Sequence, residues 1–331
     1  MIGLGSMGKR RVRCLKSLGY KESEIIGFDL REDRRAEAEE KYQIKTTGDI
    51  KKVDLNKISA LFISTPPDIH NRYIKFAIDN GKPAFVEASV ILEGLKELAR
   101  AAKKKNVLIA PSCTMRFHPA IMDITSIVKS GKYGKVTNFS YHSGQYLPDW
   151  HPWEQVKDYY VGNKSTGGGR EIIPFELTWL VDVFGMPSRA AGYYGITMDV
   201  GAKIDDTYAT IMDFGTFFGS LTVDVVARYA IRSLILNMEY GQILWRWDEG
   251  VVHLYDARDG RWVDYHMPAG QSATGYNKNI IEEMYINEAN AFIQAVEGKK
   301  TYPNTLEEDI KTLEILEEME KSFPKKKEQE H

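Results

Sequence analysis

Three glycines and one aspartate near the N-terminus have the spacing of a dinucleotide-binding site. The chain begins MIGLGSMG, which places Gly3, Gly5 and Gly8 in the pattern G-x-G-x-x-G ahead of a helical pattern that runs through Ser17. The first glycine of this pattern makes a tight turn, the second lets a pyrophosphate approach the backbone, and the third lets a helix sit close to a strand. Asp29 follows 21 residues after Gly8, near the end of the apolar segment EIIGFDL. An acid there accepts hydrogen bonds from ribose hydroxyls, so the sequence predicts NAD as the cofactor.

Two features of this region leave alternatives open. Asp29 favours NAD because a carboxylate repels a 2′-phosphate, but Arg31 could pair with that phosphate, so NADP is the alternative cofactor. Only Met1 and Ile2 precede Gly3, although a strand ahead of such a turn usually needs about five residues. We therefore expect either a native start upstream of Met1 or a trimmed recorded chain.

The following apolar segments predict where the rest of the dinucleotide binds. The segments ISALFIST, PAFVEAS and NVLIAPS alternate with helical patterns, which is typical of a doubly wound parallel sheet covered on both faces. Ligands of such sheets bind outside the carboxyl ends of the strands. The residues expected to contact the dinucleotide are Gly3, Gly5, Ser6, Met7, Gly8, Asp29, Arg31, Ser64, Thr65, Pro66, His70 and Glu87.

The pattern of residue types along the chain changes at about residue 115. Segments such as YATIMDFGTFFGSLTVDVV are rich in β-branched and aromatic residues, which indicates an open-faced, mostly antiparallel sheet. The end of the chain is helical by period, with a capping box from Thr305 to Glu308. We predict an α/β chain with a Rossmann domain over residues 1–114 and an α+β substrate and oligomerisation domain over 115–331, whose C-terminal helix packs back on the Rossmann domain.

Composition and charge exclude several classes of function. The formal net charge is −2, which gives no global field for nucleic acid or an anionic membrane. The two cysteines stand far apart in no metal spacing, so we expect neither a disulfide nor a metal site. No apolar run approaches 18 residues and no signal peptide is seen, so we expect a cytoplasmic protein. An exposed sheet face further predicts a homodimer or homotetramer.

Several longer stretches resemble the Gfo/Idh/MocA oxidoreductases along essentially the whole chain. They are IGLGSMGKRR, STPPDIHNRYIKFAIDNGKP, TMRFHPA, TGGG before a helix, and AVEGKKTYPNTLEEDIKTLEIL. The stretch GQYLPDWHPWE resembles members found in polysaccharide and sialic-acid-type sugar biosynthesis. The resemblance implies a Rossmann domain, an open-faced sheet domain, and hydride transfer between a nicotinamide and a sugar-like substrate at their junction.

Two positions depart from the family pattern. The family's Glu-Lys-Pro motif, whose lysine is expected to relay a proton, reads Glu87-Ala88-Ser89 here, and alanine cannot move a proton. The family's second motif places an aspartate and then a histidine after a glycine triplet. Here the triplet is followed by REIIPFELTW, and either Phe175 or Glu176 stands where the histidine would be. Ordinary dehydrogenase chemistry therefore needs other proton-handling residues, since a base contributes about 10²–10⁴-fold in rate.

Several residues could supply that chemistry, each with a structural alternative. Glu176 shares a helical face with Trp179, Leu180 and Val183, and Pro174 fits the first turn of that helix. The alternative for Glu176 is a structural carboxylate paired with Arg170 or Arg116. The other candidates are Tyr160 as an acid–base or sugar-binding hydroxyl, His151 as a catalytic residue, Trp153 as a stacking ring, and Arg116 as a partner for a substrate carboxylate. The alternatives for these four are packing roles in loops or between domains.

Three hypotheses about function follow. The first is an NAD(P)-dependent oxidoreductase that acts on a sugar or nucleotide-sugar-like substrate with an atypical active site. The second is a non-catalytic dinucleotide-binding protein that senses cofactor or scaffolds a complex. The third is a lyase or epimerase that uses tightly held NAD transiently.

Overall fold

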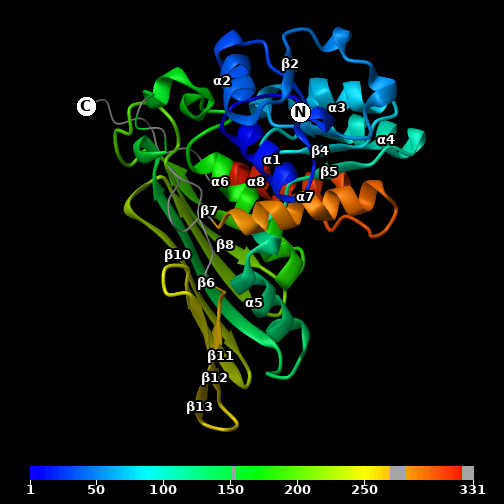
Figure 1. Ribbon diagram of the computed structural model, residues 1–331. Helices are drawn as coiled ribbons and strands as arrows, with labels where there is room; N and C mark the ends of the chain where they lie inside the picture. The colour runs from blue at the N-terminus through cyan, green and yellow to red at the C-terminus, as the bar shows by residue number, and fades with distance from the viewer. Residues whose placement is uncertain (151, 153, 269–280, 323–331) are drawn as a thin grey trace. The chain divides into compact units, whose positions relative to one another are not determined.

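The computed structural model describes residues 1–150, 152, 154–268 and 281–322 (Figure 1). It divides into two compact units. The first unit comprises Met1–Thr114 and Ile281–Lys311, and the second comprises Met115–Ile280 and Thr312–His331. The last boundary falls inside helix α8 (Leu306–Ser322), so this helix contributes residues to both units.

Short parallel strands form the sheets of the first unit. They are β1 (Ile26–Phe28), β2 (Lys45–Thr47), β3 (Leu61–Ile63), β4 (Ala84–Val86) and β5 (Ile109–Pro111). β1 pairs with β2, and the others pair in the order β3-β4-β5. Each of the segments EIIGFDL, ISALFIST, PAFVEAS and NVLIAPS therefore contains a strand, and each strand pairs over three residues. The predicted parallel sheet is confirmed.

The first two residues of the chain join the two groups of strands. Ile2 forms parallel bridges to both Phe28 and Ile63, and the amide of Phe28 donates to the carbonyl of Met1 at 2.8 Å. The amino group of Met1 donates to the carbonyl of Ile26 at 2.8 Å, and burial lowers its pKa to about 5. Met1 and Ile2 thus occupy the central strand position that directly precedes Gly3.

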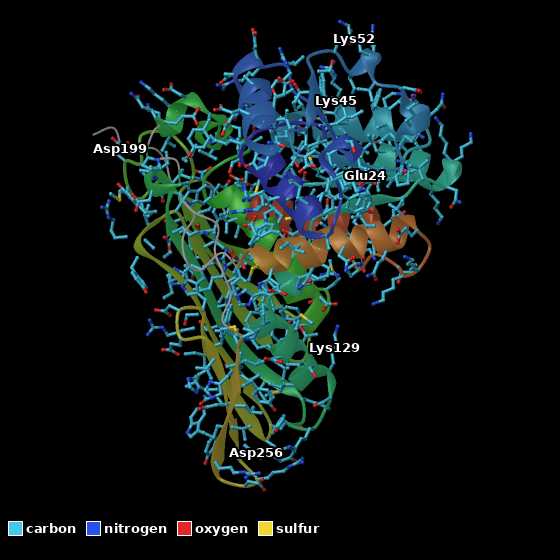
Figure 2. All side chains as sticks on the ribbon, viewed as in Figure 1. Glu24, Lys45, Lys52, Lys129, Asp199 and Asp256 are labelled. Carbon is cyan, nitrogen blue, oxygen red and sulfur yellow. The ribbon has the colours of Figure 1, made fainter. Side chains whose placement is uncertain are left out.

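Helices pack against this sheet through apolar faces. The helices of the first unit are α1 (Ser6–Ser17), α2 (Glu32–Tyr42), α3 (His70–Asp79), α4 (Leu95–Lys105) and α7 (Glu282–Val296). The rings of Phe62, Phe85 and Phe292 form the centre of the core, with centroids 5.1–5.9 Å apart. Polar residues such as Lys45 and Lys52 lie on the exposed surface (Figure 2).

A single mixed sheet dominates the second unit. Its order is β13-β12-β11-β10-β6-β9-β8-β7, and β6 and β9 are its one parallel pair. The strands are β6 (Val136–Tyr146), β7 (Arg189–Gly195), β8 (Thr207–Asp213), β9 (Phe218–Asp224), β10 (Val226–Met238), β11 (Gly241–Arg246), β12 (Val251–Asp256) and β13 (Arg261–His266). The predicted mostly antiparallel sheet is confirmed.

The two faces of this sheet differ. Helices α5 (Pro119–Lys129) and α6 (Gly169–Phe184) contact one face, which buries residues such as Tyr208 and Leu221 (Figure 1). The alternating residues point the other way, and among them Ile211 stays 54 % exposed. A strand with one covered face and one open face has alternating buried and exposed residues, which is the pattern seen in the sequence.

Helix α6 begins earlier than the sequence predicted. We placed Pro174 in the first turn, but the helix starts at Gly169, so Pro174 lies inside it. The reason is the glycine triplet, because Gly168 adopts φ +68° and a Cβ there would meet the carbonyl oxygen of Asp205 at 2.5 Å. This turn starts the helix five residues ahead of Pro174. The predicted apolar face of α6 is nevertheless buried.

Helix α8 has the predicted capping box. The amide of Thr305 donates to the Glu308 carboxylate at 2.8 Å, and the amide of Glu308 donates to Thr305 Oγ1 at 3.1 Å. Among the described helices, none is both long enough and apolar enough to span a membrane.

Candidate functional site

The glycines of the first loop have different structural requirements. Gly3 adopts φ +91°, and a Cβ there would clash with the carbonyl oxygen of Ser64. A Cβ on Gly8 would clash with the carbonyl oxygen of Gly3, so the helix α1 packs directly on the turn. Gly5 is different, since its Cβ would meet only the guanidinium of Arg34, at 3.4 Å. The fold therefore requires glycine at positions 3 and 8. At position 5, the absence of a side chain leaves the backbone of the loop accessible to a ligand.

Asp29 is anchored beside this loop. Its Oδ2 accepts a hydrogen bond from the amide of Leu4 at 2.8 Å, and its Oδ1 accepts from the amide of Arg31 at 2.9 Å. The residue is 8 % exposed. These two bonds hold the carboxylate next to the glycine loop, where an acid of a Rossmann domain contacts ribose.

The cation closest to this carboxylate is not the one singled out in the sequence. Arg31 forms an exposed ion pair with Asp33 at 2.6 Å. Arg34 instead lies 3.7 Å from Asp29 Oδ2 and beside Gly5. No spacing rule points to Arg34, because it lies in the first turn of α2 among other charged residues.

The predicted residues after β3 lie together. Ser64 follows the strand, Pro66 precedes a short 3-10 helix, and His70 Nε2 lies 2.8 Å from the carbonyl oxygen of Thr65. A carbonyl only accepts, so Nε2 carries the proton and Nδ1 is an acceptor. Burial lowers the pKa of His70, which keeps the ring neutral. His70 therefore fixes the backbone of Thr65.

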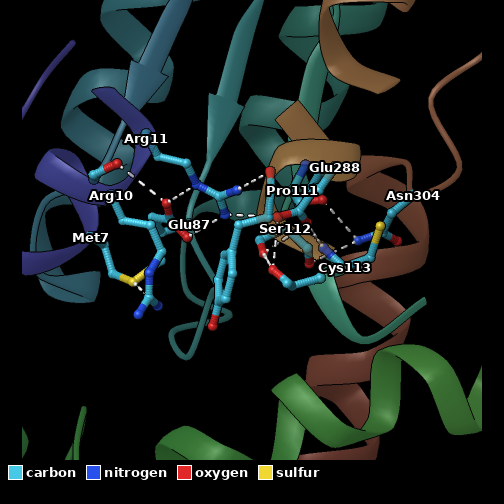
Figure 3. Close-up of polar contacts among 12 residues, drawn as sticks. Met7, Arg10, Arg11, Glu87, Pro111, Ser112, Cys113, Glu288 and Asn304 are labelled. Carbon is cyan, nitrogen blue, oxygen red and sulfur yellow. Dashed lines mark hydrogen bonds and ion pairs between the residues drawn. The ribbon is translucent and has the colours of Figure 1, made fainter. Parts of the chain in front are cut away.

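Glu87 is held by a buried arginine. Arg11 Nε donates to Glu87 Oε1 at 2.7 Å and Arg11 Nη2 donates to Oε2 at 3.0 Å, while Ser64 Oγ donates to Oε1 at 3.3 Å (Figure 3). The guanidinium also lies over the ring of Phe85, 4.3 Å from its centroid. The predicted contact between Glu87 and the dinucleotide stays a prediction, and the observed role of its carboxylate is to pair with Arg11.

A second glutamate completes this network. Glu288 is fully buried and accepts from Arg11 Nη2 at 2.7 Å, Thr114 Oγ1 at 2.7 Å, Ser112 Oγ at 3.0 Å and the amide of Cys113 at 2.6 Å (Figure 3). Burial alone would lower the pKa of Arg11, but the two carboxylates raise it well above its ordinary value. The network ties α1, the ends of β4 and β5, and α7 into one framework.

The residues of the first unit fit a nicotinamide dinucleotide. Ser6 and Met7 form the N-terminus of α1, which favours a phosphate and has no acidic residue in its first turn. With Gly5 and Asp29 they would hold the pyrophosphate and the ribose. Bound NAD supplies a hydride acceptor. Among the described residues, no group of three metal-ligating side chains gathers in one place.

In the second unit, Glu176 is a fully paired carboxylate. It is 0 % exposed, and Oε2 accepts from Tyr141 at 2.7 Å and from Trp179 at 3.0 Å. Oε1 accepts from Ser143 at 2.9 Å and from Arg232 Nε at 2.9 Å. Four donors use the acceptor capacity of the carboxylate. These contacts favour the structural alternative, with Arg232 as the partner.

The remaining predicted residues of the second unit have varied environments. Arg116 Nε donates to the carbonyl oxygen of Thr178 at 2.9 Å. Tyr160 donates to Glu171 Oε1 at 2.7 Å. His151 and Trp153 lie outside the described residues. The roles predicted for all four in substrate binding or catalysis stay predictions.

Sequence reasoning missed several charged residues that shape these regions. Arg11, Arg232 and Glu288 are buried, and Arg34 and Glu171 are half-buried. Arg11 and Glu288 are far apart in sequence, so no local pattern links them. Glu171 carried one weak signal, a carboxyl two residues after the glycine triplet and directly before an apolar run.

Comparisons with known proteins agree with this cofactor geometry. Residues 1–112 match the GFO_IDH_MocA family model, described as "Oxidoreductase family, NAD-binding Rossmann fold". The uncharacterized oxidoreductase YhhX of Escherichia coli is 26 % identical over 178 residues, which is 53 % of this chain and 48 % of that protein. The uncharacterized oxidoreductase YrbE of Bacillus subtilis is 28 % identical over 138 residues, or 40 % of each chain. The matched region thus spans about half or less of these curated relatives.

Solved structures share the fold over nearly the whole chain. Levoglucosan dehydrogenase in complex with NADH and levoglucosan has a TM-score of 0.80 at 17 % identity, covering 97 % of this chain and 95 % of that one. An oxidoreductase from Agrobacterium radiobacter in complex with NAD⁺, L-tartaric acid and magnesium has a TM-score of 0.83 at 13 % identity, covering 97 % and 94 %.

The first unit therefore matches a class of domain, the NAD-binding Rossmann fold of oxidoreductases. Within that class, residues 1–112 are similar to the Gfo/Idh/MocA oxidoreductases.

The pairing of Glu176 generates a stability prediction. Glu176→Gln removes the negative charge that accepts from the buried guanidinium of Arg232, which should cost about 3 kcal/mol of unfolding free energy. Urea denaturation followed by circular dichroism measures this loss. The control is Glu249→Gln, an exposed ion-pair residue whose loss should cost no more than about 1 kcal/mol. Equal small losses in both variants would show that the Glu176 pair does not hold the second unit together.

Proposed function

We propose that the protein is an NAD(P)-dependent dehydrogenase that oxidises or reduces a sugar or nucleotide-sugar-like substrate. The observation that carries this proposal is the loop of the first unit, where Gly5 leaves the backbone accessible and Asp29 is anchored beside it. The shared fold with a dehydrogenase solved with levoglucosan supports the sugar class.

The same loop supports NAD as the preferred cofactor. The carboxylate of Asp29 disfavours a 2′-phosphate by charge. Arg34, rather than Arg31, is the residue that would meet such a phosphate, because Arg31 is paired with Asp33. NADP is thus the secondary cofactor in this proposal.

The substrate side of the proposal rests on the second unit. Arg116 and Tyr160 are the described residues proposed to contact the substrate, together with His151 and Trp153. Glu176 would position the surrounding side chains through its four donors rather than move a proton itself.

One observation favours a second candidate, a non-catalytic dinucleotide-binding protein. Alanine stands at position 88, and the neighbouring Glu87 carboxylate is committed to Arg11. Neither residue can then relay a proton in the way the family's Glu-Lys-Pro motif implies.

A turnover assay separates the two candidates. We expect NADH absorbance to appear when the protein is incubated with NAD and a panel of sugars that includes levoglucosan and L-sorbose. Calorimetry with NAD serves as the control for cofactor binding. Tight NAD binding with no NADH from any sugar, in either reaction direction, would support the non-catalytic candidate and contradict the dehydrogenase.

The open sheet face supports a proposal about assembly. Tyr193, Ile211, Phe218 and Ile235 lie on β7, β8, β9 and β10 and are 68 %, 54 %, 60 % and 45 % exposed. A hollow of about 420 Å³ lies on β7–β9, lined in part by Tyr193 and Ile211. Large apolar patches are uncommon on monomers, so we propose a homodimer or homotetramer formed through this face.

A charge on this face should break the assembly. We expect light scattering to give a multiple of 37.7 kDa for the wild type and a smaller particle for Ile211→Glu. The control is Met122→Glu on α5, which is equally exposed at 54 % but lies off the open face. A 37.7 kDa wild-type particle at micromolar concentration would contradict the proposal.

A further inference from the structure

Two glutamates on helix α6 have opposite environments. Glu176 accepts four hydrogen bonds, one of them from the guanidinium of Arg232. Glu171 accepts its one described hydrogen bond from the hydroxyl of Tyr160, at 2.7 Å. Its other oxygen, Oε2, is enclosed and has no partner among the described residues. Glu171 itself is half-buried, but a carboxylate oxygen that is enclosed for structural reasons alone normally has a hydrogen-bond partner, and Glu171 Oε2 has none described.

The protonation of Glu171 follows from this environment. Burial raises the pKa of Glu171 to about 7, and the hydrogen bond from Tyr160 partly opposes that rise. Tyr159 lies beside Tyr160 in the loop that precedes α6. Burial raises the pKa of Tyr159, and the carboxylates of Glu171 and Glu154 raise it further. Tyr159 stays neutral near pH 7, so Glu171 is the group of this cluster that exchanges its proton there.

The glycine triplet holds Tyr160 against Glu171. A Cβ on Gly167 would clash with the carbonyl oxygen of Val161, so the loop and the start of α6 are in direct backbone contact. Thr166 Oγ1 donates to the carbonyl of Tyr160 at 2.9 Å, which closes the loop. The hydroxyl of Tyr160 is therefore fixed on the first turn of α6 rather than free to swing in solvent.

We propose that Tyr160 and Glu171 form the proton relay of the reaction, with Tyr160 as the catalytic residue that contacts the substrate hydroxyl and Glu171 acting through it. This inference rests on the proposed dehydrogenase function. In the oxidation, the substrate hydroxyl gives its proton to the oxygen of Tyr160, while the proton of Tyr160 passes to Glu171 Oε1. The C–H hydrogen leaves with both bonding electrons to NAD⁺, and the carbon–oxygen double bond forms.

The first test measures the proton on Glu171 without any substrate. In protein labelled with ¹³C at glutamate carboxyls, the signal absent from Glu171→Gln should titrate with a pKa of about 7. Tyr160→Phe removes the hydrogen bond that lowers this pKa, so the titration should move upward. Tyr159→Phe is the matched control and should leave it in place. Titration of Glu171 in the ordinary glutamate range, near 4.3, would overturn the inference.

The second test uses whichever sugar of the panel yields NADH. The wild-type kcat should rise with pH through about 7, because only ionised Glu171 can accept the proton. Tyr160→Phe and Glu171→Gln should each lower kcat by about 10²-fold or more and remove this step from the pH profile, with NAD affinity unchanged. Tyr159→Phe should keep the step.

The outcomes separate the inference from the proposed function. If NADH forms and neither variant alters the pH profile, the relay is wrong while the dehydrogenase stands. If no sugar yields NADH although Glu171 titrates near 7, the dehydrogenase fails and the relay fails with it.

Discussion

The guanidinium of Arg11, enclosed between Glu87 and Glu288, is the interaction on which the cofactor-binding unit depends. With these glutamates it brings together the helix that follows the glycine loop, the ends of the neighbouring strands β4 and β5, and a helix from more than 270 residues later in the chain. A buried charge that loses one partner costs about 3–5 kcal/mol, so neither glutamate is free to change independently. The carboxylate of Glu87 thus keeps Arg11 paired whether or not it meets a cofactor.

The second unit uses the same device on helix α6. Glu176 joins that helix to β6 through Ser143 and to β10 through Arg232. Burial lowers the pKa of His118 to about 4, and the positive charge of Arg232 contributes to this shift. His118 is thus a neutral ring at neutral pH. The proposed relay instead uses Glu171, which accepts a hydrogen bond from Tyr160 and has a second carboxylate oxygen with no described partner.

Local patterns in the sequence predicted much of the fold. Gly3, Gly8 and Asp29 have steric and hydrogen-bonding roles that their spacing implies, and the alternation in the second half predicted the sheet with one open face. The failures concern long-range partners. The pairing of Glu176 with Arg232 joins residues 56 positions apart, and no periodicity reports it. The start of α6 differs from the prediction because Pro174 is a local helix signal, whereas the observed start has a long-range partner: the amide of Gly169 donates to the carbonyl of Asp205 at 2.9 Å.

Binding of NADH to a Gly5→Val variant tests the central claim, that this loop holds a nicotinamide dinucleotide. Gly5 has φ −68°, which valine adopts without strain, and a Cβ there would meet only the flexible guanidinium of Arg34. The melting temperature should therefore stay unchanged, while NADH affinity measured by calorimetry falls at least about tenfold, or about 1.4 kcal/mol. Gly195→Val, in open space on the second unit, is the control and should bind like the wild type. A folded Gly5→Val protein that binds NADH as tightly as the wild type would contradict the account.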